Sequence, residues 1–276
     1  MTGLLENQVA IITGAGRGIG AAAARLFGQE GARVVVSDLD PEPAATIAAE
    51  IQAAGGEALA IPGDVTDPDF PDRLLSQAIA RFGKLNILVN NAGYTWDGML
   101  HKMDDEQWQA ILEVHLTAPF RMIRAAAPYL REAAKKELEE GLTPEPRCVI
   151  NVSSTSGLHG NIGQANYAAG KMGIVGLTKT VAKEWGRFGV RCNAIAFGFI
   201  DTRLTRPKEN RETIEIHGQR IALGIPEQIR QSAPERIPLG RAGSPEEAAA
   251  GILLLASPFA SYITGHTLEV TGGAGI

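Results

Sequence analysis

Two residues that lie four positions apart, Tyr167 and Lys171, could together move a proton. On a helix this spacing places both side chains on one face. An isolated phenol has a pKa near 10, and an ammonium group one turn away favours its ionised form. Lowering the pKa of the phenol to about 7 takes roughly 4 kcal/mol, which requires a site sheltered from bulk water. The pair therefore predicts a buried acid/base centre.

Ser154 lies thirteen residues before Tyr167, directly after the apolar run 147–153. That run is typical of a buried strand, and ligands of open α/β sheets bind at the carboxyl ends of the strands. We therefore expect the hydroxyl of Ser154 to join Tyr167 and Lys171 in one catalytic group.

A glycine-rich turn, TGAGRGIG at residues 13–20, joins the first expected strand to the first expected helix. Glycine allows positive φ and lets a ligand approach the backbone, and the start of a helix attracts a pyrophosphate. The P-loop pattern GxxxxGK[ST] has no match in this turn. The turn predicts a dinucleotide site formed by Gly14, Arg17, Gly18, Ile19 and Gly20.

Asp38 ends the second expected strand, twenty residues after Gly18. A carboxylate at this place accepts hydrogen bonds from an adenosine ribose and repels a 2′-phosphate. Arg17 could instead pair with that phosphate, but Leu39 and Asp40 supply no second cation. We expect NAD(H) as cofactor, with NADP(H) as the alternative.

The remaining pattern predicts the elements that position these residues. The expected strands are 9–13, 33–38, 57–62, 86–90, 147–153, 190–197 and 266–270. Helical periodicity separates them, most extensively over 105–135 and 164–186. Such alternation predicts a parallel sheet with helices on both faces. No linker divides the chain, so we expect one doubly wound α/β domain over residues 1–276.

Two segments interrupt this alternation. Residues 133–147 are charged and then broken by proline, as in a helix that runs out into an exposed loop. Residues 201–240 form a long connection, and long connections are often functional. We expect a substrate lid there, with an apolar inner face formed by Leu204, Ile214, Ile216, Ile221, Leu223 and Ile225.

Charge and composition exclude several classes of partner. Lys and Arg number 26 and Asp and Glu 31, which leaves a net charge of −5 and no general attraction for nucleic acid. The N-terminal residues show no basic targeting segment, and the longest apolar run, 248–256, is about half a membrane span. We expect a cytoplasmic protein without a membrane partner, with free thiols at Cys148 and Cys192 and no metal site.

At these positions the chain resembles the short-chain dehydrogenase/reductase family, and the match extends over essentially its whole length. The family motif TGxxxGxG corresponds to residues 13–20, NNAG to residues 90–93, and Ser…YxxxK to Ser154, Tyr167 and Lys171. The resemblance implies a seven-stranded sheet of Rossmann type and a homotetramer.

The same resemblance assigns roles to individual residues. It implies that Tyr167 is the general acid/base and that Ser154 polarises the substrate carbonyl. Lys171 would bind the nicotinamide ribose and lower the pKa of Tyr167. The remaining cofactor contacts that it implies are Asp64 and Val65 at the adenine, and Asn91, Ala92 and Gly93 along the floor of the site.

His115 stands where the family usually has an asparagine whose backbone carbonyl relays protons through a water. Pro119 lies four residues further on and has no N–H, so it cannot bond to the carbonyl of His115. We expect this carbonyl to keep the relay. A catalytic imidazole, or a merely packed histidine, is the alternative.

Phe197 replaces the proline of the family's Pro-Gly turn, close to the residues expected at the nicotinamide carboxamide, Ile200 and Thr202. An aromatic face near the nicotinamide is one expectation from this change. We also expect the orientation of the nicotinamide ring to be less strictly determined than in relatives, because the turn lacks the restricting proline.

Residues 97–103 and 160–170 resemble the 3-oxoacyl-acyl-carrier-protein reductase branch. The resemblance implies hydride transfer between NAD(H) and a secondary alcohol or ketone, such as a 3-oxoacyl thioester or a similar small carbonyl compound. One alternative is an NADP(H)-dependent reductase, since that branch prefers NADPH. A dinucleotide-binding or scaffold protein without catalysis is another, against which the intact Ser154, Tyr167 and Lys171 argue.

Overall fold

The computed structural model describes residues 3–210, 212–216 and 218–275. Its centre is a seven-stranded parallel sheet in the order β3-β2-β1-β4-β5-β6-β9. The strands are β1 Val9–Thr13, β2 Arg33–Ser37, β3 Glu57–Ala60, β4 Ile87–Asn90, β5 Arg147–Ser154, β6 Val190–Phe197 and β9 Thr267–Val270. The sequence order reverses between β3-β2-β1 and β4-β5-β6, and at such a switch point open α/β sheets bind their ligands. The predicted fold class is confirmed.

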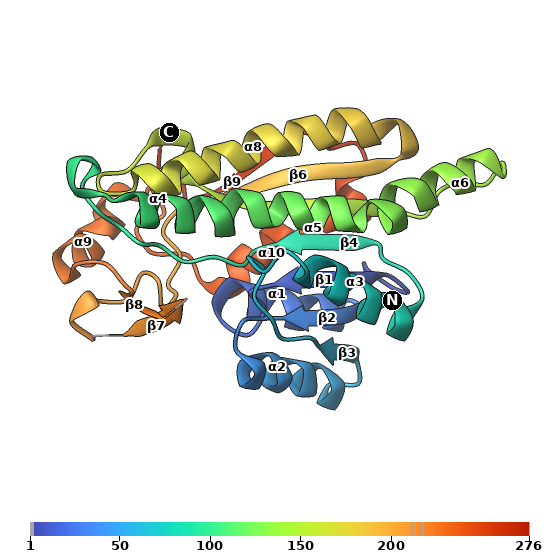
Figure 1. Cartoon of the computed structure of the whole chain (residues 1–276), viewed down its shortest axis with the longest axis horizontal. Coiled ribbons are helices and arrows are strands. Elements are labelled where there is room, and N and C mark those ends of the chain that lie inside the picture. Colours follow the sequence, from blue (N-terminus) through green and yellow to red (C-terminus); the bar gives the residue numbers. More distant parts are fainter. Residues whose placement is uncertain (1–2, 211, 217, 276) are drawn as a thin grey trace.

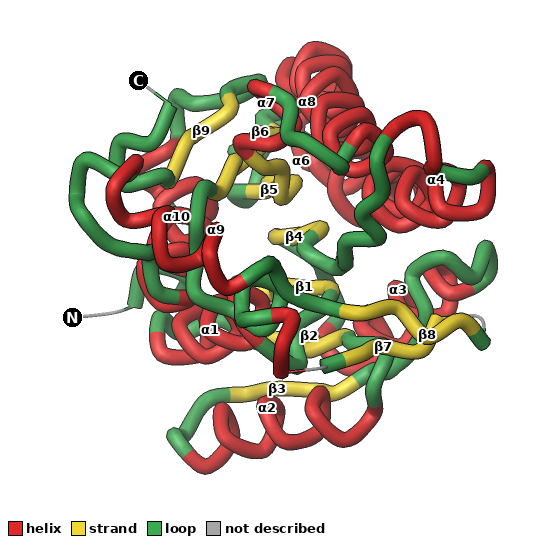
Figure 2. Tube along the Cα trace, turned by 90° about the vertical axis from the view of Figure 1, so that its left-hand side faces the viewer, coloured by secondary structure: helices red, strands yellow, loops and turns green. Residues whose placement is uncertain are grey.

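Helices cover both faces of the sheet (Figure 2). One layer contains α1 Gly18–Gln29, α2 Pro41–Ala53 and α10 Pro245–Ala256, and the other contains α3 Phe70–Phe82, α5 Ala118–Ala127 and α8 Ala165–Trp185. Because both faces are covered, the β1 residues are all buried, as are the β5 residues. This explains why these strands show no alternation of polar and apolar residues.

The expected helix 105–135 is interrupted by π-helical turns. It consists of α4 Asp105–Leu112, a π-turn Glu113–Thr117, α5, a second π-turn Pro128–Glu132 and α6 Ala133–Glu139. Pro119 explains the first interruption, because its nitrogen cannot donate to the carbonyl of His115. The helix ends at Glu139 and a loop follows, as the charged segment predicts; Glu137 bridges to Arg147 at the start of β5.

The segment 201–240 is more regular than the sequence predicts. It contains an antiparallel hairpin, β7 Thr213–Ile216 and β8 Gln219–Ala222, and the short helix α9 Glu227–Ser232. Figure 1 shows the hairpin and α9 at one end of the molecule, opposite α6. Ile221, only 2% exposed, packs with Tyr94. The expected apolar inner face is therefore present in the hairpin.

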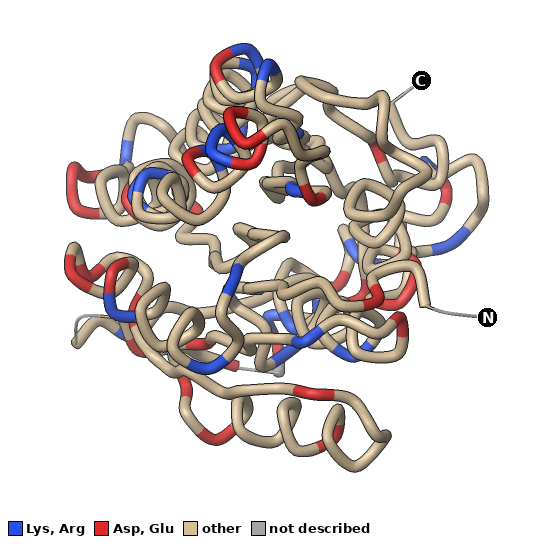
Figure 3. The backbone as a smooth tube through the Cα atoms, turned by 90° about the vertical axis from the view of Figure 1, so that its right-hand side faces the viewer, with Lys and Arg blue, Asp and Glu red and all other residues tan. Residues whose placement is uncertain are grey.

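Charged residues of both signs are interspersed around the surface helices (Figure 3). Cys148 and Cys192 lie on the neighbouring strands β5 and β6, buried and free, as predicted. Burial raises the pKa of both thiols. None of the helices in the described part of the chain is long and apolar enough to cross a membrane.

Candidate active site

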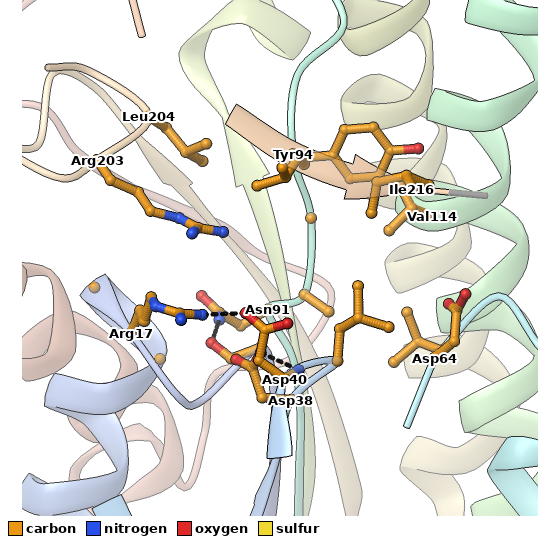
Figure 4. A pocket seen from close by; sticks show the side chains of 18 of the residues that line it. Arg17, Asp38, Asp40, Asp64, Asn91, Tyr94, Val114, Arg203, Leu204 and Ile216 are labelled. Carbon is orange, nitrogen blue, oxygen red and sulfur yellow. Dashed lines mark hydrogen bonds and ion pairs between the residues drawn. The ribbon is translucent and has the colours of Figure 1, made fainter. Parts of the chain in front are cut away.

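A cavity of about 430 Å³ lies at the carboxyl ends of β1 to β4. Most of the predicted cofactor residues line it, namely Gly14, Arg17, Gly18, Ile19, Gly20, Asp38, Asp64, Val65, Asn91, Ala92, Gly93 and Thr202. Its lining also contains residues of the 201–240 segment, including Arg203 and all of β7. Figure 4 shows this second group across the cavity from Arg17 and Asp38.

The glycine-rich turn has the geometry expected of a pyrophosphate site. Gly14 and Gly18 have φ of +62° and +54°, and α1 begins at Gly18 without a side-chain cap. A Cβ on Gly18 would meet only the side chain of Thr202, at 3.7 Å, so the backbone is open towards the cavity. The uncapped N–H groups of α1 therefore face a space in which they can bind an anion.

Asn91 and Thr13 fasten this turn to the end of β4. Asn91 Nδ2 donates to the carbonyls of Thr13 (2.9 Å) and Gly14 (3.0 Å). Thr13 Oγ1 accepts from the backbone N–H groups of Asn91 and Ala92, both at 3.1 Å. The floor of the cavity is thus held by the two loops that the sequence assigns to the cofactor.

Asp38 is held in place by the backbone around it. Its Oδ2 accepts from the N–H of Gly16 at 2.8 Å and its Oδ1 from the N–H of Asp40 at 3.1 Å. Arg17 forms an ion pair with Asp40. A carboxylate oxygen has a second lone pair, so Asp38 can still accept a hydrogen bond from a ribose hydroxyl.

Arg203 is the cation that sequence reasoning missed in this cavity. Burial lowers the pKa of its guanidinium, Arg17 lowers it further, and Glu212, Asp38 and Asp40 act in the opposite direction. Leu39 and Asp40 supply no second cation, as expected, but the folded chain brings one from a distant segment. No local signal in the sequence places Arg203 near Asp38.

Ser154, Tyr167 and Lys171 come together beside this cavity. The side chain of Ser154 lies beside the hydroxyl of Tyr167, and Lys171 Nζ lies 5.6 Å from the centre of the tyrosine ring. Lys171 Nζ also donates to the carbonyl of Val152 at 2.6 Å. Among the described residues, the cavity lining contains none of the three. Tyr167 is separated from it by an apolar cluster that includes Tyr94, Val114 and Ile221.

Asn166, which sequence reasoning also missed, positions the tyrosine. It is fully buried, and its Nδ2 donates to the carbonyls of Trp96 (3.1 Å) and Gln107 (3.0 Å). Its Oδ1 accepts from the N–H of Tyr167 at 2.8 Å. The first turn of α8 is therefore fixed to α4 and to the loop after β4.

The sequence predicts a lowered pKa for Tyr167, but in the protein without its cofactor this pKa is raised. Burial raises the pKa of this phenol to about 12, and the neighbouring Ser154 acts in the opposite direction. Burial also lowers the pKa of Lys171 to about 7, so the lysine is only partly charged at neutral pH. In both groups desolvation is the largest cause of the shift in pKa.

His115 lies against Tyr167, with ring centres 4.9 Å apart at 88°. Its Nε2 is 2.7 Å from the carbonyl oxygen of Tyr94, so Nε2 carries the proton and donates. Burial lowers the pKa of the imidazole well below its ordinary value. Within the described residues, Nδ1 is buried without a hydrogen-bond partner. A neutral ring with an unprotonated Nδ1 is a poor proton donor.

The loop after β6 differs in part from expectation. Thr202 lines the cavity, whereas Ile200 is 5% exposed and its carbonyl accepts from Thr205 Oγ1 at 2.6 Å. Phe197 is buried in the hydrophobic cluster between the sheet and the layer of α1, α2 and α10. It therefore packs in the interior and offers no aromatic face to the cavity.

Comparison with known proteins agrees with this geometry. A profile of the short chain dehydrogenase family matches residues 8–213. A 3-oxoacyl-[acyl-carrier-protein] reductase of Thermotoga maritima is 38% identical over 269 residues, 98% of each chain, and one of Synechocystis sp. is 41% identical over 271 residues, 98% of this chain and 97% of the relative. An uncharacterised oxidoreductase of Mycobacterium tuberculosis is 39% identical over 273 residues, 99% of each chain.

Proposed function

The chain belongs to the short-chain dehydrogenase family, and on that premise we propose that it reduces a 3-oxoacyl thioester, or a similar small ketone, with NADH. The family predicted from the motifs is confirmed, and the protein is a nicotinamide-dependent oxidoreductase. The observation that carries the substrate proposal is the placement of Ser154 beside Tyr167, next to a cavity lined by the predicted cofactor residues. The names of the relatives supply the substrate class.

In this mechanism Ser154 donates a hydrogen bond to the substrate carbonyl oxygen, and Tyr167 gives that oxygen a proton. A nicotinamide cofactor, held by the residues that line the cavity, would supply the hydride for the carbonyl carbon. A phenol with a pKa near 12 is protonated at neutral pH, which is the form needed for reduction. Lys171 Nζ lies 5.6 Å from the ring centre of the phenol, where it would hold a ribose hydroxyl and return a proton to the tyrosine.

We propose that His115 acts through its backbone carbonyl and that its side chain is not required. Pro119 removes the helical N–H that would bond to this carbonyl, and the chain forms a π-turn there. His115→Asn should therefore retain turnover within roughly ten-fold and keep the pH dependence of kcat, since it removes no transition-state interaction. Steady-state rates between pH 6 and 9 provide the measurement. Loss of turnover in this variant, and in His115→Ala, would assign the chemistry to the imidazole.

Asp38 supports NAD(H) over NADP(H), because a 2′-phosphate would meet its carboxylate at close range. Asp38→Ser should shift the preference between the two cofactors, measured as the ratio of kcat/KM, by about 10- to 100-fold towards NADP(H). With Asp38 removed, Arg17 and Arg203, which both line the cavity, are available to the 2′-phosphate. Asp69→Ser, an exposed change outside the cavity, is the matched control. An unchanged ratio would remove Asp38 from the specificity argument.

A panel of substrates tests the activity itself. β-Ketoacyl thioesters such as acetoacetyl-coenzyme A, cyclic ketones and secondary alcohols are assayed with NAD(H) and NADP(H) in parallel. We expect the highest kcat/KM with a thioester and NADH. Turnover confined to non-acyl ketones would overturn the substrate class, and a strong preference for NADPH would overturn the cofactor proposal.

We further propose that the protein is a single-domain cytoplasmic enzyme that assembles as a homotetramer. Residues 201–240 would act as its lid. Membership of the family supports the assembly, and the packing of Ile221 against Tyr94 beside Tyr167 supports the lid. Light scattering coupled to gel filtration measures the mass of the assembly directly.

A further inference from the structure

The hairpin β7–β8 lies against the apolar end of the dinucleotide cavity. Ile214 and Ile216 line this end together with Val65, Val114 and Tyr94. Ile214 pairs in register with Ile221, whose side chain is almost fully buried in the same cluster. Figure 4 shows Ile216 beside Tyr94 and Val114, away from the charged group around Asp38. The hairpin is thus a packed wall of the cavity.

The order of subsites along the cavity indicates which part of a dinucleotide meets this wall. The uncapped start of α1 at Gly18 is suited to the pyrophosphate, and Asp38 is suited to the adenosine ribose. A purine attached to that ribose has to lie in the apolar space near Val65 and Val114. Aliphatic and aromatic side chains on both sides of a flat ring are what such a base requires.

We propose that β7 forms the outer wall of the adenine subsite, and that the hairpin must separate from Val65 and Val114 before the cofactor can leave. The proposal rests on the placement of the dinucleotide under the proposed function. Arg203, at the other end of the same segment, faces Arg17, Asp38 and Asp40. The segment therefore covers the adenosine half at two places, with an apolar contact at the base and a cation at the ribose edge.

The test measures binding of the adenosine half alone. ADP-ribose affinity is determined by calorimetry, and NADH release by stopped-flow fluorescence, for Ile214→Ser and Ile216→Ser. We expect ADP-ribose to bind about ten-fold more weakly and NADH to leave about ten-fold faster, because each variant removes an apolar wall. Ile229→Ser, the same change at a 57% exposed position of α9, is the control and should alter neither value.

Reduced nicotinamide mononucleotide, which lacks the adenosine half, distinguishes the possible outcomes. Its affinity should not change in either hairpin variant. Unchanged ADP-ribose affinity would overturn the proposal, and so would an equal loss for both ligands. Because the binding measurements need no turnover, failure of every substrate would contradict the proposed function and leave this result standing.

Two further measurements keep the proposal testable if the serine variants unfold. Ile216→Val keeps the side chain apolar but removes a methylene, and a smaller rise in the NADH release rate is expected. Amide hydrogen exchange of residues 213–216 in the unmodified protein should slow when ADP-ribose binds. If the exchange rates of these amides do not change when ADP-ribose binds, closure of the hairpin over the base is contradicted.

Discussion

Tyr167→Phe should lower kcat by about 10³-fold, because it removes the only proposed donor of a proton to the substrate oxygen. The ring remains, so its contacts with His115 and the cluster around Ile221 are kept. Cofactor affinity should therefore stay within about three-fold, since the variant removes an interaction made mainly in the transition state. Steady-state kinetics and calorimetric titration with NADH measure the two quantities separately.

The control for this variant is Tyr262→Phe, which removes the same hydroxyl from a fully exposed side chain. Its kcat should equal that of the unmodified protein. If Tyr167→Phe keeps more than about a tenth of the activity, the proton comes from another group, and the proposed general acid is wrong. If NADH binding is lost as well, the phenol has a structural role that the geometry does not indicate.

Lys171→Met should abolish most of the activity and at the same time stabilise the protein purified without cofactor. Burial lowers the pKa of this lysine from 10.5 to about 7. Below pH 7 the ammonium is charged in both the folded and unfolded states and the full cost of burying it applies. Between pH 7 and 10.5 the unfolded state holds the additional proton, so the free energy of unfolding rises with pH; above that range the cost is absent.

At pH 7.5 the cost of the buried lysine is roughly 4 kcal/mol, because this pH lies about three units below the ordinary pKa of 10.5. Methionine leaves the carbonyl of Val152 without its donor, which costs about 1–3 kcal/mol. A net gain of roughly 2 kcal/mol should raise the melting temperature by a few degrees. Thermal unfolding at pH 7.5 and 10 measures the gain and its decline with pH.

Lys179→Met is the matched control, an exposed lysine on the same helix, and it should change the melting temperature little. A lower melting temperature for Lys171→Met, or a gain that does not decline at high pH, would show that the ammonium is not strained in the folded protein. A variant that loses activity but gains stability is typical of a residue that serves catalysis and destabilises the folded protein.

Most of the sheet could be predicted because its strands are buried on both faces. Arg33–Ser37 contains three consecutive valines without polar alternation, which is typical of a strand that is buried on both faces. The hairpin β7–β8 was missed because its strands have only four residues each. The signal that could have found it is Gly218, which lies between two short segments of mixed polar and apolar residues, 213–216 and 219–222; its φ is +79°, a value that glycine adopts readily.

The candidate site was predictable wherever spacing along one element decides the geometry. Tyr167 and Lys171 share a helix face, and Ser154 is the last residue of a strand, so the position of each within its own element could be predicted from the sequence. Arg203 directly follows Thr202, which the resemblance places at the cofactor, but nothing in the sequence shows that its side chain reaches Asp38. The pKa of Tyr167 was predicted wrongly, since a sequence shows a neighbouring charge but not how far both groups are removed from water.

The two buried thiols have a practical consequence. Cys148 and Cys192 have pKa values raised by burial and are therefore slow to form the reactive thiolate. Maleimide dyes should bypass them, so a single cysteine placed at the exposed Gln219 could be labelled in the otherwise natural sequence. A fluorophore at that tip of the hairpin would then report its movement in real time without first replacing any native residue.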